Sequence, residues 1–281
     1  MKRLLKITFF ILAIIFLIII YARYIGTMGL TTKEYTIIDK NIPEGFDGLK
    51  IVHFSDIHYN RAITLKKIES IVKEINLIKP DIVVFTGDLL DKDAILTNTD
   101  YDELGKILKK INAPSGKYAI LGNHDYEKEE ENAIKILKNS NFTYLENTYD
   151  IIYDKYGNKV FIGGIGSVIQ NKDDIDKTLN SLSNKDNISY KIILIHEPDI
   201  ADEIATGYKI NLILAGHSHG GQIRLPLIGA LYTPPYAKKY QNEYYKINDC
   251  NLYISTGIGV STINYRLWDK PSINFYRINS H

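Results

Sequence analysis

Two histidines stand one residue apart in the run AGHSHGGQ, residues 215–222, directly after the apolar residues 210–214. Imidazole nitrogen is the commonest protein ligand for a transition metal, and small neighbouring residues let the backbone turn and an ion approach. On its own, a His-x-His pair in a loop is more often solvated or structural than metal-binding. His217 and His219 therefore indicate a metal site only if other parts of the chain supply partners.

Four further polar runs follow apolar stretches in the same way. They are Ser55-Asp56-Ile57-His58, Gly87-Asp88-Leu89-Leu90-Asp91, Gly122-Asn123-His124-Asp125 and His196-Glu197-Pro198-Asp199. The carboxyl ends of parallel strands meet at one edge of an α/β sheet, so these runs would bring their side chains together. Carboxylate, imidazole and amide groups together suit manganese, iron or zinc, whereas an all-oxygen set would suit magnesium or calcium. The sequence therefore predicts a centre of two divalent metal ions, with manganese placed before iron or zinc.

Each run also has a reading without a metal. Asp56-Ile57-His58 is compatible with a turn that caps a helix, Gly122-Asn123 with a left-handed turn, and His196 with a buried core histidine. However, five of the seven histidines, at positions 58, 124, 196, 217 and 219, come directly after apolar runs. Chance would scatter them along the chain, so the joint pattern favours the metal site.

In this order the five motifs resemble those of the calcineurin-like metallophosphoesterases. The resemblance covers residues 49–277, and the longer runs at 196–199 and 216–226 are similar to the bacterial membrane-tethered phosphodiesterase branch. It implies two packed mixed β-sheets flanked by helices, a four-layer sandwich, with the metals at one end. It also implies that one metal is held by Asp56, His58, Asp88 and His219, and the other by Asp88, Asn123, His196 and His217.

The same resemblance implies hydrolysis of a phosphate ester. Two cations neutralise the phosphoryl oxygens and activate a shared hydroxide, which attacks phosphorus in line with the leaving oxygen. His124 would face the phosphate as the catalytic residue that protonates the leaving group, oriented by Asp56. Arg224 is either a phosphate ligand or an ordinary surface arginine. We expect a phosphodiester or a pyrophosphate as substrate rather than a monoester.

The motifs do not match those of two other classes of binuclear hydrolase. Metallo-β-lactamase-like enzymes need His-x-His-x-Asp-His, but Gly220 and Gly221 follow His219. Amidohydrolases need His-x-His after the first strand, where this chain has Asp56-x-His58. The remaining alternative is a non-catalytic scaffold that binds a partner through the same face, although such proteins usually lose a ligand and this chain keeps every motif residue.

Composition excludes some classes of protein. The chain of 281 residues has 34 basic and 33 acidic side chains, a net charge of +1, so it lacks the basic excess of a nucleic-acid binder. A hydrophobic content of 45% is ordinary for a globular protein. The single cysteine, Cys250, cannot form a disulfide within the chain.

The first 25 residues predict an uncleaved membrane anchor. Residues 7–22 carry no charge, and the flanking leucines and tyrosine extend this stretch towards the ~20 residues that span a bilayer. A cleaved signal peptide is the alternative, but no Ala-x-Ala exit follows. Three positive residues precede the span and one follows it, which predicts a cytoplasmic N-terminus and a catalytic domain outside the cytoplasm. Tethering favours a substrate at the membrane, such as a lipid headgroup or a cell-envelope intermediate.

Alternating strands and helices must position the motifs. Residues 26–48 would form a linker with an opening strand at 35–38, and residues 49–281 one α/β phosphoesterase domain. Apolar runs and helical periodicity predict strands at 49–54, 81–86, 117–121, 148–153, 160–165, 190–195, 210–214, 252–255 and 273–276, and helices at 65–78, 102–111, 129–138 and 173–182. Gly157-Asn158 predicts a hairpin, and the last two strands are expected to be antiparallel.

Overall fold

The structure is a computed structural model that describes residues 1–182 and 188–281, apart from the side chains of residues 128, 129 and 181. Its described strands form two six-stranded sheets and a small separate ribbon. In spatial order, the first sheet contains β1 (Thr31–Ile38), β14 (Ser272–Asn279), β2 (Leu49–Phe54), β3 (Ile82–Thr86), β4 (Gly116–Ile120) and β5 (Thr143–Tyr144). The second contains β12 (Tyr244–Ile247), β13 (Cys250–Ile254), β9 (Leu212–Ala215), β8 (Tyr190–Leu194), β7 (Lys159–Gly164) and β6 (Thr148–Tyr153). The ribbon pairs β10 (Arg224–Leu225) with β11 (Gly229–Ala230).

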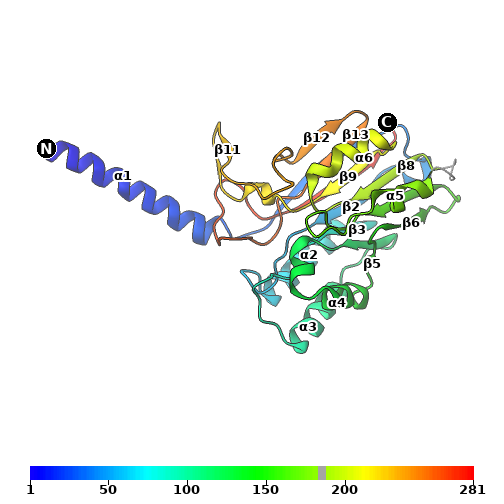
Figure 1. Cartoon of the computed structure of the whole chain (residues 1–281), viewed down its shortest axis with the longest axis horizontal. Coiled ribbons are helices and arrows are strands. Elements are labelled where there is room, and N and C mark those ends of the chain that lie inside the picture. The colour runs from blue at the N-terminus through cyan, green and yellow to red at the C-terminus, as the bar shows by residue number, and fades with distance from the viewer. Residues whose placement is uncertain (183–187) are drawn as a thin grey trace.

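The two sheets pack face to face, and helices cover their outer faces (Figure 1). The first sheet is covered by α2 (Leu65–Ile78), α3 (Asn98–Lys109) and α4 (Asn123–Asn139), and the second by α5 (Ile175–Leu179) and α6 (Ala201–Gly207). Short 3-10 turns lie at Glu44–Phe46, Asn180–Leu182, Pro198–Ile200 and His219–Gly221. The four-layer α/β fold is the one expected from the sequence.

Strand β2 shows why the central strands are apolar on both faces. Ile51 points into the core between the sheets, whereas Val52 and Phe54 pack in the core beneath the helices. Successive side chains of a strand point to opposite faces, so a strand covered on both sides becomes a continuous apolar run. The same burial explains why most strands could be recognised from the sequence.

Several boundaries differ from those expected. Helix α4 begins at Asn123 rather than at residue 129, so two motif residues lie in its first turn and not in a loop. Helix α5 ends at Leu179 and continues as a 3-10 turn, while α6 was not expected. The hairpin of β6 and β7 is confirmed. The last two strands are only partly antiparallel, because β13 pairs in parallel with β9, and β14 in parallel with β1.

An apolar helix precedes the domain. Helix α1 (Lys2–Ile20) continues into a π-helical turn, Tyr21–Ile25, and projects away from the domain (Figure 1). This helix is long and apolar enough to cross a membrane. Within residues 1–25, all of which are described, only Ala22 is buried, and its carbonyl oxygen accepts a 2.9 Å hydrogen bond from the Arg266 N–H. The helix end is therefore attached to a loop of the domain.

Candidate metal centre

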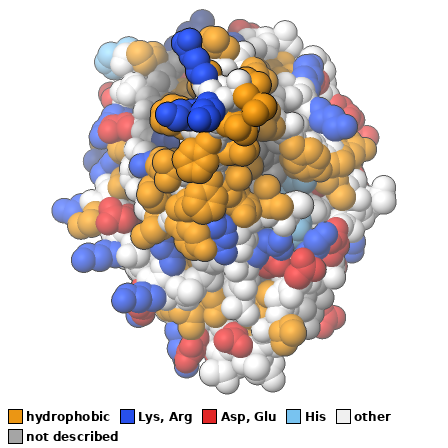
Figure 2. All heavy atoms as spheres, turned by 90° about the vertical axis from the view of Figure 1, so that its left-hand side faces the viewer, with side chains coloured by type: hydrophobic (Ala, Val, Ile, Leu, Met, Phe, Trp, Pro, Cys, Tyr) orange, Lys and Arg blue, Asp and Glu red, His pale blue; other side chains and the backbone are white. Residues whose placement is uncertain are grey.

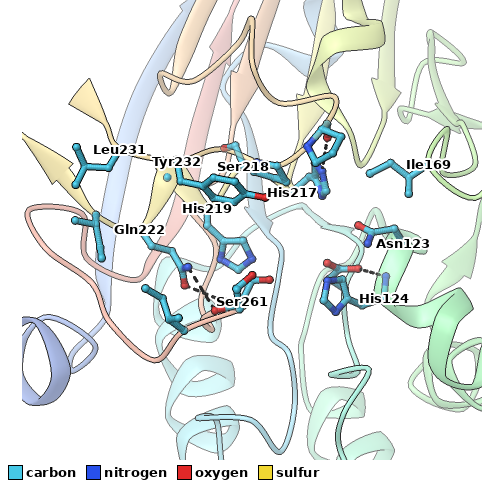
Figure 3. A pocket seen from close by; sticks show the side chains of 17 residues that line it. Asn123, His124, Ile169, His217, Ser218, His219, Gln222, Leu231, Tyr232 and Ser261 are labelled. Carbon is cyan, nitrogen blue, oxygen red and sulfur yellow. Dashed lines mark hydrogen bonds between the residues drawn. The ribbon is translucent and has the colours of Figure 1, made fainter. Parts of the chain in front are cut away.

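The five polar runs meet at one end of the sandwich. Three of them follow β2, β3 and β4 of the first sheet, and two follow β8 and β9 of the second. In Figure 3, Asn123 and His124 approach from the first turn of α4, and His217 and His219 approach from the loop after β9. The sequence argument placed these side chains on a single sheet edge; the edges of both sheets supply them.

Among the described residues, three buried groups of side chains could each hold a metal ion: His58, Asp91 and His124 form one, and expected ligands form the other two. In one of these two Asp56, His58 and His219 bring their ligand atoms within 4.8 Å of one another, and in the other Asp88, His196 and His217 do so. The Oδ2 atom of Asp88 lies 3.3 Å from His196 Nε2 and 3.4 Å from His58 Nε2. One carboxylate therefore lies next to an imidazole from each group.

The backbone at these residues adopts a conformation that side chains rarely accept. Positive φ angles occur at Asp56 (53°), His58 (47°), Asp88 (58°), His217 (65°) and His219 (49°). Left-handed conformations are uncommon for residues other than glycine, asparagine and aspartate, and they cluster at functional sites. The surrounding hydrogen bonds hold them in place: the His217 N–H donates to the Asp56 carboxylate, and the Asp56 N–H donates to Gly87 O.

The donor atoms of the cluster fit divalent metals. The His196 ring donates from Nδ1 to Thr86 O at 2.6 Å, so its Nε2 is the nitrogen that faces Asp88, at 3.3 Å from Oδ2. The His217 ring donates from Nε2 to Pro235 O at 2.9 Å, which leaves a lone pair on Nδ1. The buried Oδ1 atom of Asn123 has no hydrogen-bond partner among the described residues. Such an orphaned acceptor beside free imidazole nitrogens suits a bound cation.

Charge at the centre is unbalanced in the way that a cation would correct. Burial lowers the pKa of His58 and of His217 to about 3, so both rings are neutral, the form that binds metals. Burial, with a smaller contribution from the charge of Asp88, raises the pKa of Asp56 to about 7 against the lowering effect of His196. Carboxylates gathered without water therefore repel one another.

Two neighbouring carboxylates were not assigned a role from the sequence. Asp125 accepts hydrogen bonds from the N–H groups of Asp88, Leu90 and Gly122 at 2.9, 2.9 and 3.0 Å, so it ties the loop after β3 to the start of α4. Asp91 lies with its Oδ2 atom 3.6 Å from His58 Nδ1. Their positions within the quoted motifs were the signal that could have identified them.

Arg266 was also not identified from the sequence, because no local motif or periodicity indicates its role. Its side chain is fully buried, and it donates to the carbonyl oxygens of Gly259 and Thr256 at 2.7 Å from Nη2. The same atom lies 3.4 Å from His219 Nδ1. Arg266 therefore ties the loop at 256–259 to the second histidine of the His-x-His pair.

A cavity of about 460 Å³ opens above the cluster. Its floor includes Asp88, Asn123, His124, His217 and His219. Apolar residues form much of its wall, among them Ile169, Ile223, Leu231, Tyr232, Pro234 and Ile263. Figure 3 shows Leu231 and Tyr232 on one side of the opening and Ile169 on the other.

The contacts of His124, Asp56 and Arg224 bear on the roles expected for them from the sequence. His124 lines the cavity, its N–H donates to Asp88 Oδ1 at 2.9 Å, and its buried Nδ1 has no hydrogen-bond partner among the described residues. Asp56 contacts Ser55, His217 and His219, rather than the expected His124. Arg224 donates to Gly220 O at 2.8 Å and to Gln241 O at 3.0 Å, and it lines a separate cavity, so its contacts are structural.

Known proteins resemble this chain in sequence. The profile of the calcineurin-like phosphoesterase family matches residues 49–221. The metallophosphoesterase YkuE of Bacillus subtilis is 38% identical over 261 residues, which covers 92% of this chain and 89% of YkuE. A transmembrane protein with metallophosphoesterase domain of Bos taurus is 29% identical, covering 87% of this chain and 56% of its own. The phosphodiesterase YaeI of Escherichia coli is 26% identical, covering 82% of each chain.

Proposed function

The chain belongs to the calcineurin-like phosphoesterase family, and from this premise we propose that it hydrolyses a phosphodiester or a pyrophosphate with two divalent metal ions. The observation that carries the proposal is Asp88, whose carboxylate lies within 3.4 Å of an imidazole nitrogen from each buried group, at the floor of an open cavity. Similarity to the phosphodiesterase YaeI supports a diester as substrate.

The proposed ligands are the seven side chains expected from the sequence. Asp56, His58 and His219 would hold one ion, Asn123, His196 and His217 the other, and Asp88 would serve both. The mixed nitrogen and oxygen donors support manganese first, with iron or zinc as alternatives. Bound there, the ions would neutralise phosphoryl oxygens and lower the pKa of a water molecule.

The chain's own residues would orient the ester and move a proton. The cavity floor places His124 next to Asp88, and the His124 ring packs edge-on against His58 with centroids 4.7 Å apart. Because it lines the cavity, His124 is the residue that we assign to protonate the leaving oxygen while a water oxygen bonds to phosphorus and the bond to the leaving group breaks. The buried Asp125 accepts hydrogen bonds from the N–H groups of Asp88 and Gly122, and so fixes the loop of Asp88 relative to the start of α4.

The division of the chain follows from the same proposal. Residues 1–25 would be a single-pass anchor, residues 26–48 a connection that adds β1 to the first sheet, and residues 49–281 the phosphoesterase domain. The similarity to a transmembrane metallophosphoesterase supports a membrane location. We propose that the N-terminus is cytoplasmic and that the domain lies outside, near a lipid headgroup or a cell-envelope intermediate.

The test is hydrolysis of bis(4-nitrophenyl) phosphate by the full chain in detergent. We expect release of nitrophenol that stops with a chelator and returns on addition of Mn²⁺, in parallel with metal content. A protein that binds two equivalents of metal but hydrolyses neither this diester nor a pyrophosphate would be the non-catalytic scaffold instead.

A further inference from the structure

An apolar hairpin projects from the domain next to the cavity. We define it as residues 225–232, which include β11 and the turn that connects it to β10. Leu227 is fully exposed at its tip, Ile228 is 70% exposed, and Leu231 and Tyr232 are also exposed. Four large apolar side chains on eight residues are unusual for a surface in contact with water alone.

The backbone conformation at the tip is also unfavourable for a large apolar residue. Leu227 has a φ angle of 66°, in the left-handed region that favours glycine, asparagine and aspartate. A leucine there is strained, and full exposure gives it no packing in return. Local turn chemistry in water would select a small polar residue, so the leucine indicates an apolar environment outside the described chain.

The hairpin stands on the side of the molecule from which the anchor helix leaves. Figure 1 shows β11 at the edge of the domain where α1 projects, and β6 at the opposite end. Figure 2, seen from the anchor side, shows hydrophobic side chains gathered in the middle of this face, where α1 projects toward the viewer. A membrane crossed by α1 would therefore lie against this edge.

Backbone contacts connect the hairpin to the helix end. The Leu231 N–H donates to Ile223 O, and Ile223 forms a bridge with Leu267. The preceding residue, Arg266, donates to Ala22 O in the turn after α1. Trp268, the residue after Leu267, is 58% exposed. Tryptophan at such a place is typical of a membrane interface, because its ring is apolar and its N–H is polar.

The same apolar surface continues into the cavity. Leu231 and Tyr232 belong to the hairpin and also line the cavity, where Ile223 and Ile263 extend the apolar wall towards the histidines. A ligand entering from the hairpin side would pass apolar residues before its phosphate reached Asp88. That order matches a molecule with an apolar tail and a phosphodiester head.

We propose that the apolar hairpin and Trp268 lie in the interface of the bilayer that α1 spans, and that the cavity receives an amphiphilic phosphodiester from that bilayer, its apolar tail along Leu231 and Tyr232. The substrate part of this inference rests on the proposed function; the docking of the hairpin to lipid does not. The occupant of the apolar surface is the lipid membrane.

Fluorescence quenching by brominated lipids tests the docking. Trp268 is the single tryptophan, so Trp268→Phe provides a background for one new probe at a time. Ile228→Trp places the probe on the hairpin, and Tyr156→Trp places it in the β6–β7 turn at 71% exposure, a close match. In proteoliposomes of phosphatidylcholine with brominated acyl chains, we expect the emission of the first to fall and that of the second to stay unchanged. Equal emission loss, or none, at both positions overturns the proposal.

A pair of substrates separates this inference from the proposed function. The variant Leu227→Asn/Ile228→Asn changes residues outside the cavity lining and relieves the strain at 227. We expect it to hydrolyse soluble bis(4-nitrophenyl) phosphate like the unchanged chain, but to hydrolyse hexadecyl 4-nitrophenyl phosphate held in vesicles about tenfold more slowly, because two apolar contacts with lipid are lost. Equal rates on the vesicle substrate would contradict the inference. Failure of the unchanged chain on both substrates would refute the proposed function and leave the quenching result standing.

Discussion

Five of the seven proposed ligands hold a backbone conformation that their side chains disfavour. Each left-handed residue costs about 1–2 kcal/mol relative to ordinary backbone. Hydrogen bonds to the backbone offset this cost. The His58 N–H donates to Asp88 O at 3.1 Å, and the Asp88 N–H donates to Asp125 at 2.9 Å. The strain is therefore a sign that selection acted on the direction of these side chains and not on the stability of their loops.

Neighbouring residues at the start of α4 are predicted to have separable roles. Asn123→Ala removes the orphaned amide oxygen, so we expect metal content to fall by about one equivalent, together with activity. His124→Ala leaves the proposed ligands intact, so we expect turnover to fall roughly 10²–10⁴-fold with metal content preserved. Metal analysis and diesterase assays on both variants check this. Parallel loss of metal and turnover in His124→Ala would refute its catalytic assignment.

Arg266 is predicted to be the arginine on which stability depends most. Arg266→Met leaves carbonyl oxygens of the 256–259 loop without their donor and Asp269 without its partner at 3.6 Å, so we expect a loss of about 3–5 kcal/mol in unfolding free energy. The control is Arg277→Ala. Arg277 is partly exposed and its ion pair with Glu34 is long, at 3.8 Å, so its expected cost is below about 1 kcal/mol. Urea denaturation measures both, and equal costs would show that Arg266 contributes no more than a surface ion pair.

At the scale of elements, glycines let the loops after neighbouring strands approach closely. A side chain at Gly122 would place its Cβ 2.2 Å from Asp88 Oδ1 and 2.5 Å from His196 Cε1. We therefore predict that Gly122→Ala displaces both side chains and reduces metal content and activity at least about tenfold, as small displacements at reacting centres do. Gly207→Ala in α6 is the control, since its Cβ would meet nothing within 4 Å. Unchanged metal content in Gly122→Ala would mean that the loop can relax.

The elements also show which parts of the fold can be read from a sequence. Strands such as β3 were recognisable because burial on both faces makes them continuous apolar runs. The start of α4 was placed six residues late, because Asn123 and His124 resembled a loop motif and the acidic residues at 127–131 resembled a first turn. The pairing of β14 between β1 and β2 was not accessible, since it joins segments more than 200 residues apart. Arg266 had no periodicity or motif to identify it.

At the scale of the whole molecule, the candidate metal centre joins the two sheets. Asp56, His58, Asp88 and Asn123 come from the first sheet and its helix, whereas His196, His217 and His219 come from the second. Ions bound between them would add contacts that exist only when the sheets are packed. They would also offset the burial and the nearby charge of Asp88 that raise the pKa of Asp56 to about 7. Metal binding should therefore stabilise the packing of the whole domain and not only the loops.

Metal binding is accordingly predicted to raise the melting temperature of the full chain in detergent. Ligand that binds only the folded state at 100 times its dissociation constant adds about 2.7 kcal/mol of stability. For a domain of this size that corresponds to a rise of roughly 5–10 °C. Differential scanning calorimetry with Mn²⁺ and then with excess chelator measures the rise and its reversal. Asp88→Asn, which weakens the carboxylate shared by both groups, should remove most of the rise. A melting temperature that Mn²⁺ leaves unchanged in the unaltered chain would show that the two sheets do not share an ion, because a ligand with no effect on the transition does not prefer the folded state.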